Sequence, residues 1–270
     1  MPTALAGAKG RSEGLAFEVE LIEMFNTVIP NISHAATQSV ASTSGGTCRS
    51  KTDILVDGES YSIKNPGKSS ASIQIMVTAL HKFLESYNAD EDTRNAFKLF
   101  LGLSNGFGKL LKENKIKESD LNYNDELRRQ RVKFSSLSQH SRDGILSFLN
   151  KNKRDIVDIV VRRGWADDSK DFANKMIWCD SSVRQKSDVE HLCLFDSEEV
   201  INTICEYDWE VRPSQTVLHL GPLTLQMKGS GKGEAYHYPQ FNCSLNDLRR
   251  AEIVSFEGDY KQILNYMMAS

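Results

Sequence analysis

Long apolar runs are missing from this sequence: none approaches the roughly 18 consecutive residues that a membrane-spanning helix requires. The opening residues, MPTALAGAKGRSEG, also lack the apolar stretch of a signal peptide, so we expect a cytoplasmic protein without a membrane partner. The five cysteines contain no C-x-x-C pair, which argues against a disulfide framework and against a structural zinc site. We therefore expect reduced, partly buried thiols.

A strong excess of positive charge is absent as well, because the chain carries a net charge of −3. Phosphate recognition depends on clustered rather than total Lys and Arg, so the position of the clusters matters more than the sum. Taken singly, each cluster is more typical of a solvated face than of a DNA contact. The clusters comprise Lys109, Lys112, Lys115 and Lys117; Arg128, Arg129, Arg131 and Lys133; Lys151, Lys153 and Arg154; Arg162 and Arg163; and Lys228 and Lys232.

The chain is 270 residues long and 40% apolar, which is enough for one large domain or two small ones and predicts a substantial core; we treat it as one domain. Apolar spacing and capping residues such as Ser138 and Asp196 predict helices. These are expected at 14–29, in the later part of 71–88, and at 93–104, 138–150, 153–163 and 197–207. Strands are expected at 175–179, 215–220, 223–228 and 236–245, besides a hairpin within 51–65. The order of these elements along the chain, with helices first, a hairpin in the centre and strands late, predicts an α/β protein with a mixed sheet flanked by helices.

The stretch KTDILVDGESYSIKN, residues 51–65, contains the polar residues that form the candidate functional site. Asp57-Gly58 is a strong signal for a two-residue turn, and this turn would pair Ile54 with Tyr61. Because side chains alternate along a strand, one face then carries apolar residues and the other a polar set. The apolar face comprises Ile54, Val56, Tyr61 and Ile63, and the other face Asp53, Leu55, Ser60, Ser62 and Lys64. We expect Asp53, Ser62 and Lys64 to converge on one point.

This arrangement suits the hydrolysis of a phosphodiester, in which a carboxylate holds a divalent cation such as Mg²⁺ and an ammonium stabilises charge on the phosphate. An Asp and a Lys on a hairpin are nevertheless more often plain surface residues. Glu18 lies beside the apolar stripe of the first expected helix. It could ligate the metal, or it could simply reach solvent.

The pattern D-x₈-S-x-K, formed by Asp53, Ser62 and Lys64, resembles the PD-(D/E)XK nuclease signature. The wider context is similar to type II restriction endonucleases of the MspI and HinP kinds. The resemblance covers about four fifths of the chain. It is carried in order by FEVELIEMF, GGTCRSKTDILV, YSIKNPGKSSASIQ, residues 134–165, LTLQMKGSGKG and YPQFN.

The resemblance implies a Mg²⁺-dependent endonuclease with a restriction-endonuclease-like mixed β-sheet flanked by helices and additional C-terminal strands. Such an enzyme would cut double-stranded DNA at a short GC-rich palindrome and bind DNA as a monomer. Asp53 would be the principal metal ligand, aided by a carbonyl near Ile63 and by Glu18. Lys64 would be the catalytic lysine, with Ser62 where the usual acidic residue stands. The implied organisation is one domain over 1–270, with a catalytic core at about 12–90, a helical middle at 91–210 and DNA-contacting strands at 211–250.

The same resemblance implies a set of DNA-binding residues, whose side chains can bond base edges or phosphates. The set comprises Lys68, Ser72, Gln74, Gln226, Lys228, Lys232, Gln240 and Asn242. Asn242 stands where the family has a lysine. Three other interpretations remain: a DNA repair or structure-specific nuclease of the same fold, a DNA-binding relative that has lost catalysis at Ser62, and an interaction domain, which the acidic pI would suit.

Overall fold

We describe a computed structural model of the chain. It describes residues 19–21, 23–24, 33–34, 51–56, 59–64, 73–78, 80–101, 133–165, 169, 172–179, 191–211, 216–227 and 239–269. Across these ranges, no helix is both long enough and apolar enough to cross a membrane.

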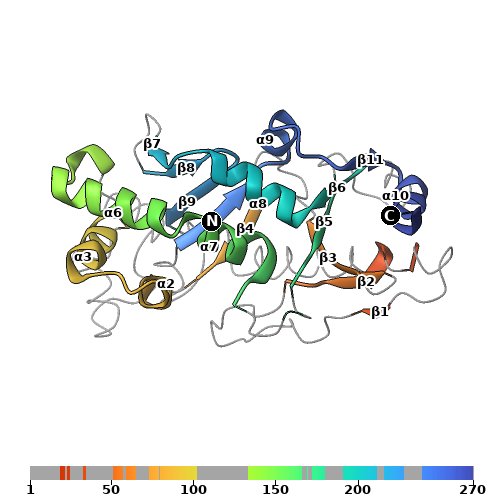
Figure 1. Cartoon of the computed structure of the whole chain (residues 1–270), viewed down its shortest axis with the longest axis horizontal. Coiled ribbons are helices and arrows are strands. Elements are labelled where there is room, and N and C mark those ends of the chain that lie inside the picture. Colours follow the sequence, from red (N-terminus) through yellow and green to blue (C-terminus); the bar gives the residue numbers. More distant parts are fainter. Residues whose placement is uncertain are drawn as a thin grey trace, which may run out of the picture.

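The first sheet is mixed, with six strands in the order β1-β2-β3-β5-β6-β11 (Figure 1). Strand β3 runs parallel to β5, while every other neighbouring pair is antiparallel. The strands are β1 (Ser33–His34), β2 (Ile54–Val56), β3 (Glu59–Lys64), β5 (Lys175–Cys179), β6 (Leu192–Asp196) and β11 (Phe256–Gly258). The segment 91–210 was expected to be mainly helical, but it supplies two strands of this sheet, β5 and β6. Of these two strands, the sequence predicted β5 and not β6.

The second sheet is antiparallel, with five strands in the order β4-β10-β9-β8-β7. The strands are β4 (Ile73–Val77), β7 (Glu210–Val211), β8 (Leu218–Leu220), β9 (Leu223–Met227) and β10 (Pro239–Cys243). The expected turn at Gly221 joins β8 to β9. Gly221 has φ +53°, and a Cβ there would lie 2.5 Å from the Tyr207 ring, so only glycine suits the position.

The helices begin close to where their capping residues predict. The Ser138 hydroxyl accepts a hydrogen bond from the Ser141 N–H, and the Asp196 carboxylate accepts two from the N–H groups of Glu198 and Glu199. The helical elements are α2 (Leu80–Ser86), α3 (Glu91–Phe100), η3 (Phe134–Ser136), α6 (Gln139–Lys151), α7 (Lys153–Asp158), the π-helical η4 (Ile159–Arg163), α8 (Ser197–Glu206), α9 (Leu245–Arg250) and α10 (Tyr260–Ala269).

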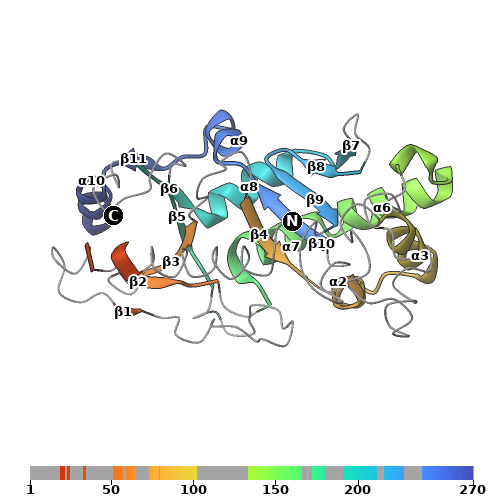
Figure 2. The same cartoon turned by 180° about the vertical axis from the view of Figure 1, so that it is seen from behind.

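Two apolar clusters cover the two faces of the first sheet. Along β5, Met176 and Trp178 belong to the larger cluster, while Ile177 and Cys179 belong to the smaller one. The larger cluster also contains residues of the second sheet and of α8, so it joins the two sheets. The smaller cluster packs α10 and the helical residues around Leu21 on the opposite face. Figure 2 shows α10 and β11 at one end of the molecule and α3 and α6 at the other.

The structure therefore confirms an α/β architecture with a mixed sheet flanked by helices. Strands β4 and β6, the short strands β1, β7 and β11, and helices α9 and α10 were not expected from the sequence.

Candidate active site

The hairpin of β2 and β3 has the register that the sequence predicts. Ile54 pairs with Tyr61, and Leu55 with Ser60. The four residues expected on the apolar face, Ile54, Val56, Tyr61 and Ile63, all lie in the smaller cluster. The turn at positions 57–58 lies outside the described residues.

The polar side of this hairpin is not a solvated face. Ser60 and Ser62 are both buried, and Ser62 has no exposed surface at all. The parallel register places Ser62 beside Met176 and Lys64 beside Trp178. Because registered neighbours project to the same face of a sheet, Ser62 and Lys64 lie on the face that the larger cluster covers. The predicted site therefore faces the core that the two sheets share.

Asp53, Ser62 and Lys64 converge as expected. The Ser62 hydroxyl donates to Asp53 Oδ2 at 3.0 Å, and the Ile63 N–H donates to the same oxygen at 2.6 Å. Lys64 Nζ donates to Ser62 Oγ and lies 3.8 Å from Asp53 Oδ2. The side chains of Lys64 and Asp53 are only 14% and 20% exposed, so water screens this ion pair less than it would a surface pair.

The hydroxyl of Ser62 connects the two charged groups. A serine hydroxyl has a single hydrogen to donate, and here that hydrogen goes to Asp53. The oxygen in turn accepts from Lys64 Nζ. Lys64 Nζ also donates to the Ile63 carbonyl at 3.2 Å. Ser62 thus holds the carboxylate and the ammonium in one hydrogen-bonded chain.

The backbone that carries Asp53 is fixed at several points. Thr52 Oγ1 donates to the carbonyl of Phe172 at 2.8 Å, just before β5 begins. The Asp53 N–H donates to the Tyr61 carbonyl at 2.8 Å. Sequence reasoning did not single out Thr52, and nothing in the sequence points to its partner 120 positions away.

The donor set fits a hard cation with few protein ligands. Among the described residues, no group of three or more His, Cys, Asp or Glu side chains is placed to hold a metal ion. Mg²⁺, however, is commonly held by one or two carboxylates together with waters and substrate phosphate oxygens. Asp53 offers a carboxylate, and the Ile63 carbonyl has a second lone pair beside the one that Lys64 uses. Glu18, the other expected ligand, lies outside the described residues.

The second sheet gathers several of the expected DNA-binding residues on one face. Gln226 pairs directly with Gln240, and Asn242 pairs with Thr224 on one side and with Gln74 on the other. Gln240 Nε2 donates to Asn242 Oδ1 at 2.5 Å. Gln226 and Gln240 are partly exposed, whereas Asn242 is buried. Gln74 is placed by its backbone only.

Four of the expected DNA-binding residues cannot be placed in this way. Lys68, Ser72, Lys228 and Lys232 lie outside the described residues, as do the basic clusters at 109–117 and 128–131.

The basic clusters along α6, α7 and η4 are largely engaged in ion pairs. Lys153 pairs with Asp208 at 3.5 Å, and Arg154 pairs with Glu198. Arg162 Nε lies 2.6 Å from Asp158, and Arg163 pairs with the same carboxylate. These contacts favour a structural role for the cations over phosphate binding.

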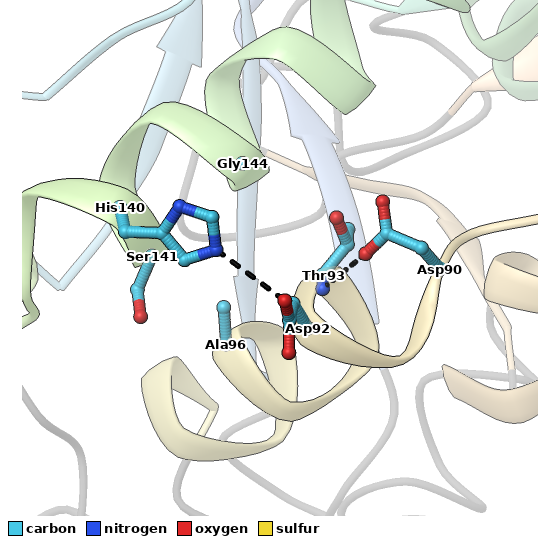
Figure 3. Close-up of a pocket in the computed structure, with 7 residues that line it drawn as sticks. All are labelled: Asp90, Asp92, Thr93, Ala96, His140, Ser141 and Gly144. Atoms are coloured by element: carbon cyan, nitrogen blue, oxygen red, sulfur yellow. Dashed lines mark hydrogen bonds and ion pairs between the residues drawn. The ribbon is translucent and has the colours of Figure 1, made fainter.

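A hollow between α3 and α6 contains none of the expected site residues (Figure 3). It is lined by Asp90, Asp92, Thr93, Ala96, His140, Ser141 and Gly144. Asp90 caps α3, and the N–H and hydroxyl of Thr93 lower the pKa of its carboxyl. His140 and Asp92, 3.4 Å apart, are both largely exposed. Helix capping and a surface ion pair account for these groups.

Comparison with known proteins adds no identification. No protein-family model matches the chain, and a search of the curated proteins found no match.

Proposed function

We propose that this protein is a Mg²⁺-dependent endonuclease with a restriction-endonuclease-like fold that hydrolyses phosphodiester bonds in double-stranded DNA. Its closest functional class would be the type II restriction endonucleases, which cut at a short palindrome, here a GC-rich one. The proposal rests on one observation above all: Asp53, Ser62 and Lys64 form a hydrogen-bonded group, largely shielded from water, in the D-x₈-S-x-K pattern.

The residues of this group have separate tasks. Asp53, the Ile63 carbonyl and Glu18 would hold the metal, which when bound supplies Lewis-acid polarisation of the phosphate and acidifies a bound water. Lys64 places a positive charge next to Asp53, where it can stabilise the negative charge that grows on the phosphate during attack. Ser62 keeps Lys64 and Asp53 at a fixed separation, so little reorganisation is needed when charge develops.

The second sheet supplies chemistry suited to the DNA itself. Gln226 and Gln240 lie directly opposite each other and are partly exposed, and amide side chains can both donate to and accept from base edges. The register of β10 with β4 brings Gln74 into the same row as Asn242. The engaged arginines of η4 make this sheet a better candidate for DNA contact than the helices.

Cleavage of plasmid DNA tests the proposal. Purified protein with Mg²⁺ should give discrete fragments. Asp53→Ala and Lys64→Ala should each lower the cleavage rate by about 100-fold or more, because the first removes a metal ligand and the second removes a positive charge that stabilises the transition state. Affinity for DNA, measured with Ca²⁺ in place of Mg²⁺, should change only a few-fold. The matched controls Asp143→Ala and Lys98→Ala remove exposed charges on α6 and α3 and should cut like the unaltered protein.

The alternatives give different results in the same experiment. Cutting only of branched or mismatched DNA would identify a structure-specific repair nuclease. DNA binding in Ca²⁺ without cleavage in Mg²⁺ would identify a DNA-binding relative that has lost catalysis. A protein with no salt-dependent affinity for DNA would overturn the proposal and favour an interaction domain.

A further inference from the structure

A β-bulge interrupts the pairing of β4 with β10. Phe241 pairs with Met76, but the next residue, Asn242, pairs with Gln74, so Ile75 is the extra residue on β4. The extra residue of a bulge is left out of the regular ladder of hydrogen bonds. Its carbonyl therefore needs a partner from elsewhere in the molecule if it is buried.

Lys51, just before β2 of the first sheet, supplies that partner. Its Nζ donates to the Ile75 carbonyl at 2.8 Å, and Lys51 is only 8% exposed. Burying an ammonium is costly unless hydrogen bonds compensate, and a methionine would fill a similar space without that cost. The ammonium of Lys51 joins the segment before β2 to β4 through a buried hydrogen bond.

The position of Lys51 in the chain suggests what its contact with Ile75 does. Lys51 stands two residues before Asp53, and the intervening Thr52 is tied to the Phe172 carbonyl. The backbone of Asp53 is tied to Tyr61. Three successive residues thus attach the start of the hairpin to three different segments, and the attachment by Lys51 reaches the second sheet. Its acceptor, Ile75, directly follows Gln74.

We infer that Lys51 is a positioning residue that fixes Asp53 relative to the second sheet. Lys51 thereby couples the position of Asp53 to β4, the strand that pairs with the amide-bearing β10. This inference rests on the proposed nuclease function, and it adds a link between the surface that binds DNA and the group that cleaves it.

Kinetics of Lys51 variants test the link. Lys51→Met removes the hydrogen-bond donor but keeps most of the length of the side chain. It should lower the single-turnover cleavage rate about 10- to 100-fold, because a small misplacement of a reacting group has an effect of that size. The Kd for DNA in Ca²⁺ should stay within about threefold, since the amide side chains are untouched. Lys51→Arg keeps a cationic donor and should recover most of the rate.

Lys153→Met is the matched control. Lys153 Nζ also donates to a backbone carbonyl, that of Tyr207 at 2.7 Å, but this contact joins α7 to the end of α8. The control should therefore cut at the rate of the unaltered protein. Equal losses of rate in Lys51→Met and Lys153→Met, or a loss in Lys51→Met that appears entirely in Kd, would overturn the inference.

Amide hydrogen exchange gives a readout that needs no activity. Lys51→Met should raise exchange in peptides that cover β4, residues 73–77, and leave those that cover β8 unchanged. Unchanged exchange in β4 overturns the inference whether or not the protein cuts DNA. Raised exchange in a protein that does not cut DNA removes the nuclease function but keeps the link between the sheets. If Lys51→Met does not fold, Lys51→Gln, which retains a shorter donor, is expected to fold and to show the same pattern to a smaller degree.

Discussion

At the scale of single residues, Ser62 shows how a neutral side chain can stand at the position where the PD-(D/E)XK pattern has an acid. Its hydroxyl donates to Asp53 and accepts from Lys64, so both of its hydrogen-bonding roles are used inside the protein. A hydroxyl in this position organises the two charged groups without adding a second negative charge. The charge of the Asp53 carboxylate is balanced by Lys64, whose Nζ lies 3.8 Å from Asp53 Oδ2.

Ser62→Asp tests this interpretation. A second carboxylate beside Asp53 repels the first, and a divalent cation relieves that repulsion. Without Mg²⁺ we expect the variant to unfold roughly 5 °C or more below the unaltered protein, which corresponds to a loss of about 2 kcal/mol. Adding Mg²⁺ should raise its Tm more than that of the unaltered protein. Thermal unfolding with EDTA or Mg²⁺ measures both.

Ser62→Ala is the control for this prediction. It removes the hydroxyl but adds no charge, so its Tm should not gain extra sensitivity to Mg²⁺. An equal response to Mg²⁺ in Ser62→Asp and Ser62→Ala would contradict the role of Ser62 described above.

At the scale of elements, η4 shows two adjacent arginines that are engaged in ion pairs within the protein. The helix widens after Asp158, and the Gly164 N–H donates to the carbonyl of Ile159, five residues earlier, at 2.8 Å. Arg162 and Arg163 both pair with the Asp158 carboxylate, which is only 14% exposed. Arg162 also reaches Glu198 on α8 at 3.6 Å. The arginines thereby fasten η4 to its neighbours.

Asp158→Asn should be destabilising for this reason. The substitution leaves two adjacent guanidinium groups in a partly buried place without their shared carboxylate. We expect the free energy of unfolding to fall by about 2–3 kcal/mol, somewhat less than for a fully buried pair. Urea unfolding measures the change, with Asp143→Asn on the exposed side of α6 as the control. Affinity for DNA should stay unchanged, and a large loss of affinity in the folded variant would place the arginines at the DNA after all.

Local signals in the sequence predicted the structural features that depend on residues close together in the chain, namely a hairpin register and a helix start. The alternation around Ile54 and Tyr61 predicted the hairpin register, and the cap at Asp196 predicted the start of α8. The convergence of Asp53 with Lys64 followed from the same alternation. The bulge at Ile75 could not be predicted, because it arises in the pairing of β4 with the distant strand β10. The contacts of Lys51 and Thr52 could not be predicted either, because their partners lie 24 and 120 positions away, respectively, and no local pattern encodes such pairings.

At the scale of the whole molecule, both clusters and the second sheet bury thiols. Cys179 lies in the smaller cluster, Cys193 in the larger one on the neighbouring strand β6, and Cys243 in the second sheet. Burial raises the pKa of the Cys179 and Cys243 thiols well above the ordinary value. Burial also raises the pKa of Cys193 from 9.0 to about 12, although the nearby Arg249 opposes the shift. Raised pKa values favour the protonated form of these thiols, which is the less nucleophilic one, at neutral pH.

The raised pKa values predict a specific loss of stability in alkali. Above about pH 9 the unfolded chain releases the thiol protons while the folded chain retains them, so the unfolded state is favoured. The stabilisation is complete below pH 9 and, for Cys193, is lost between pH 9 and about 12. Each such thiol should lower the free energy of unfolding by about 1.4 kcal/mol per pH unit in that range. Urea unfolding at pH 8, 9 and 10 under reducing conditions measures this slope.

Cys193→Ser isolates one thiol from the others. A serine hydroxyl does not ionise in this range and can keep the hydrogen bonds that Cys193 makes with Arg249 and Glu257. The slope of the unfolding free energy against pH should therefore become shallower by about one proton. Cys205→Ser removes a half-buried thiol on α8 and should alter the slope less. If Cys193→Ser and the unaltered protein lose stability equally between pH 9 and 10, the Cys193 thiol is not shielded in the core that joins the two sheets, and the packing described for β6 is wrong at that point.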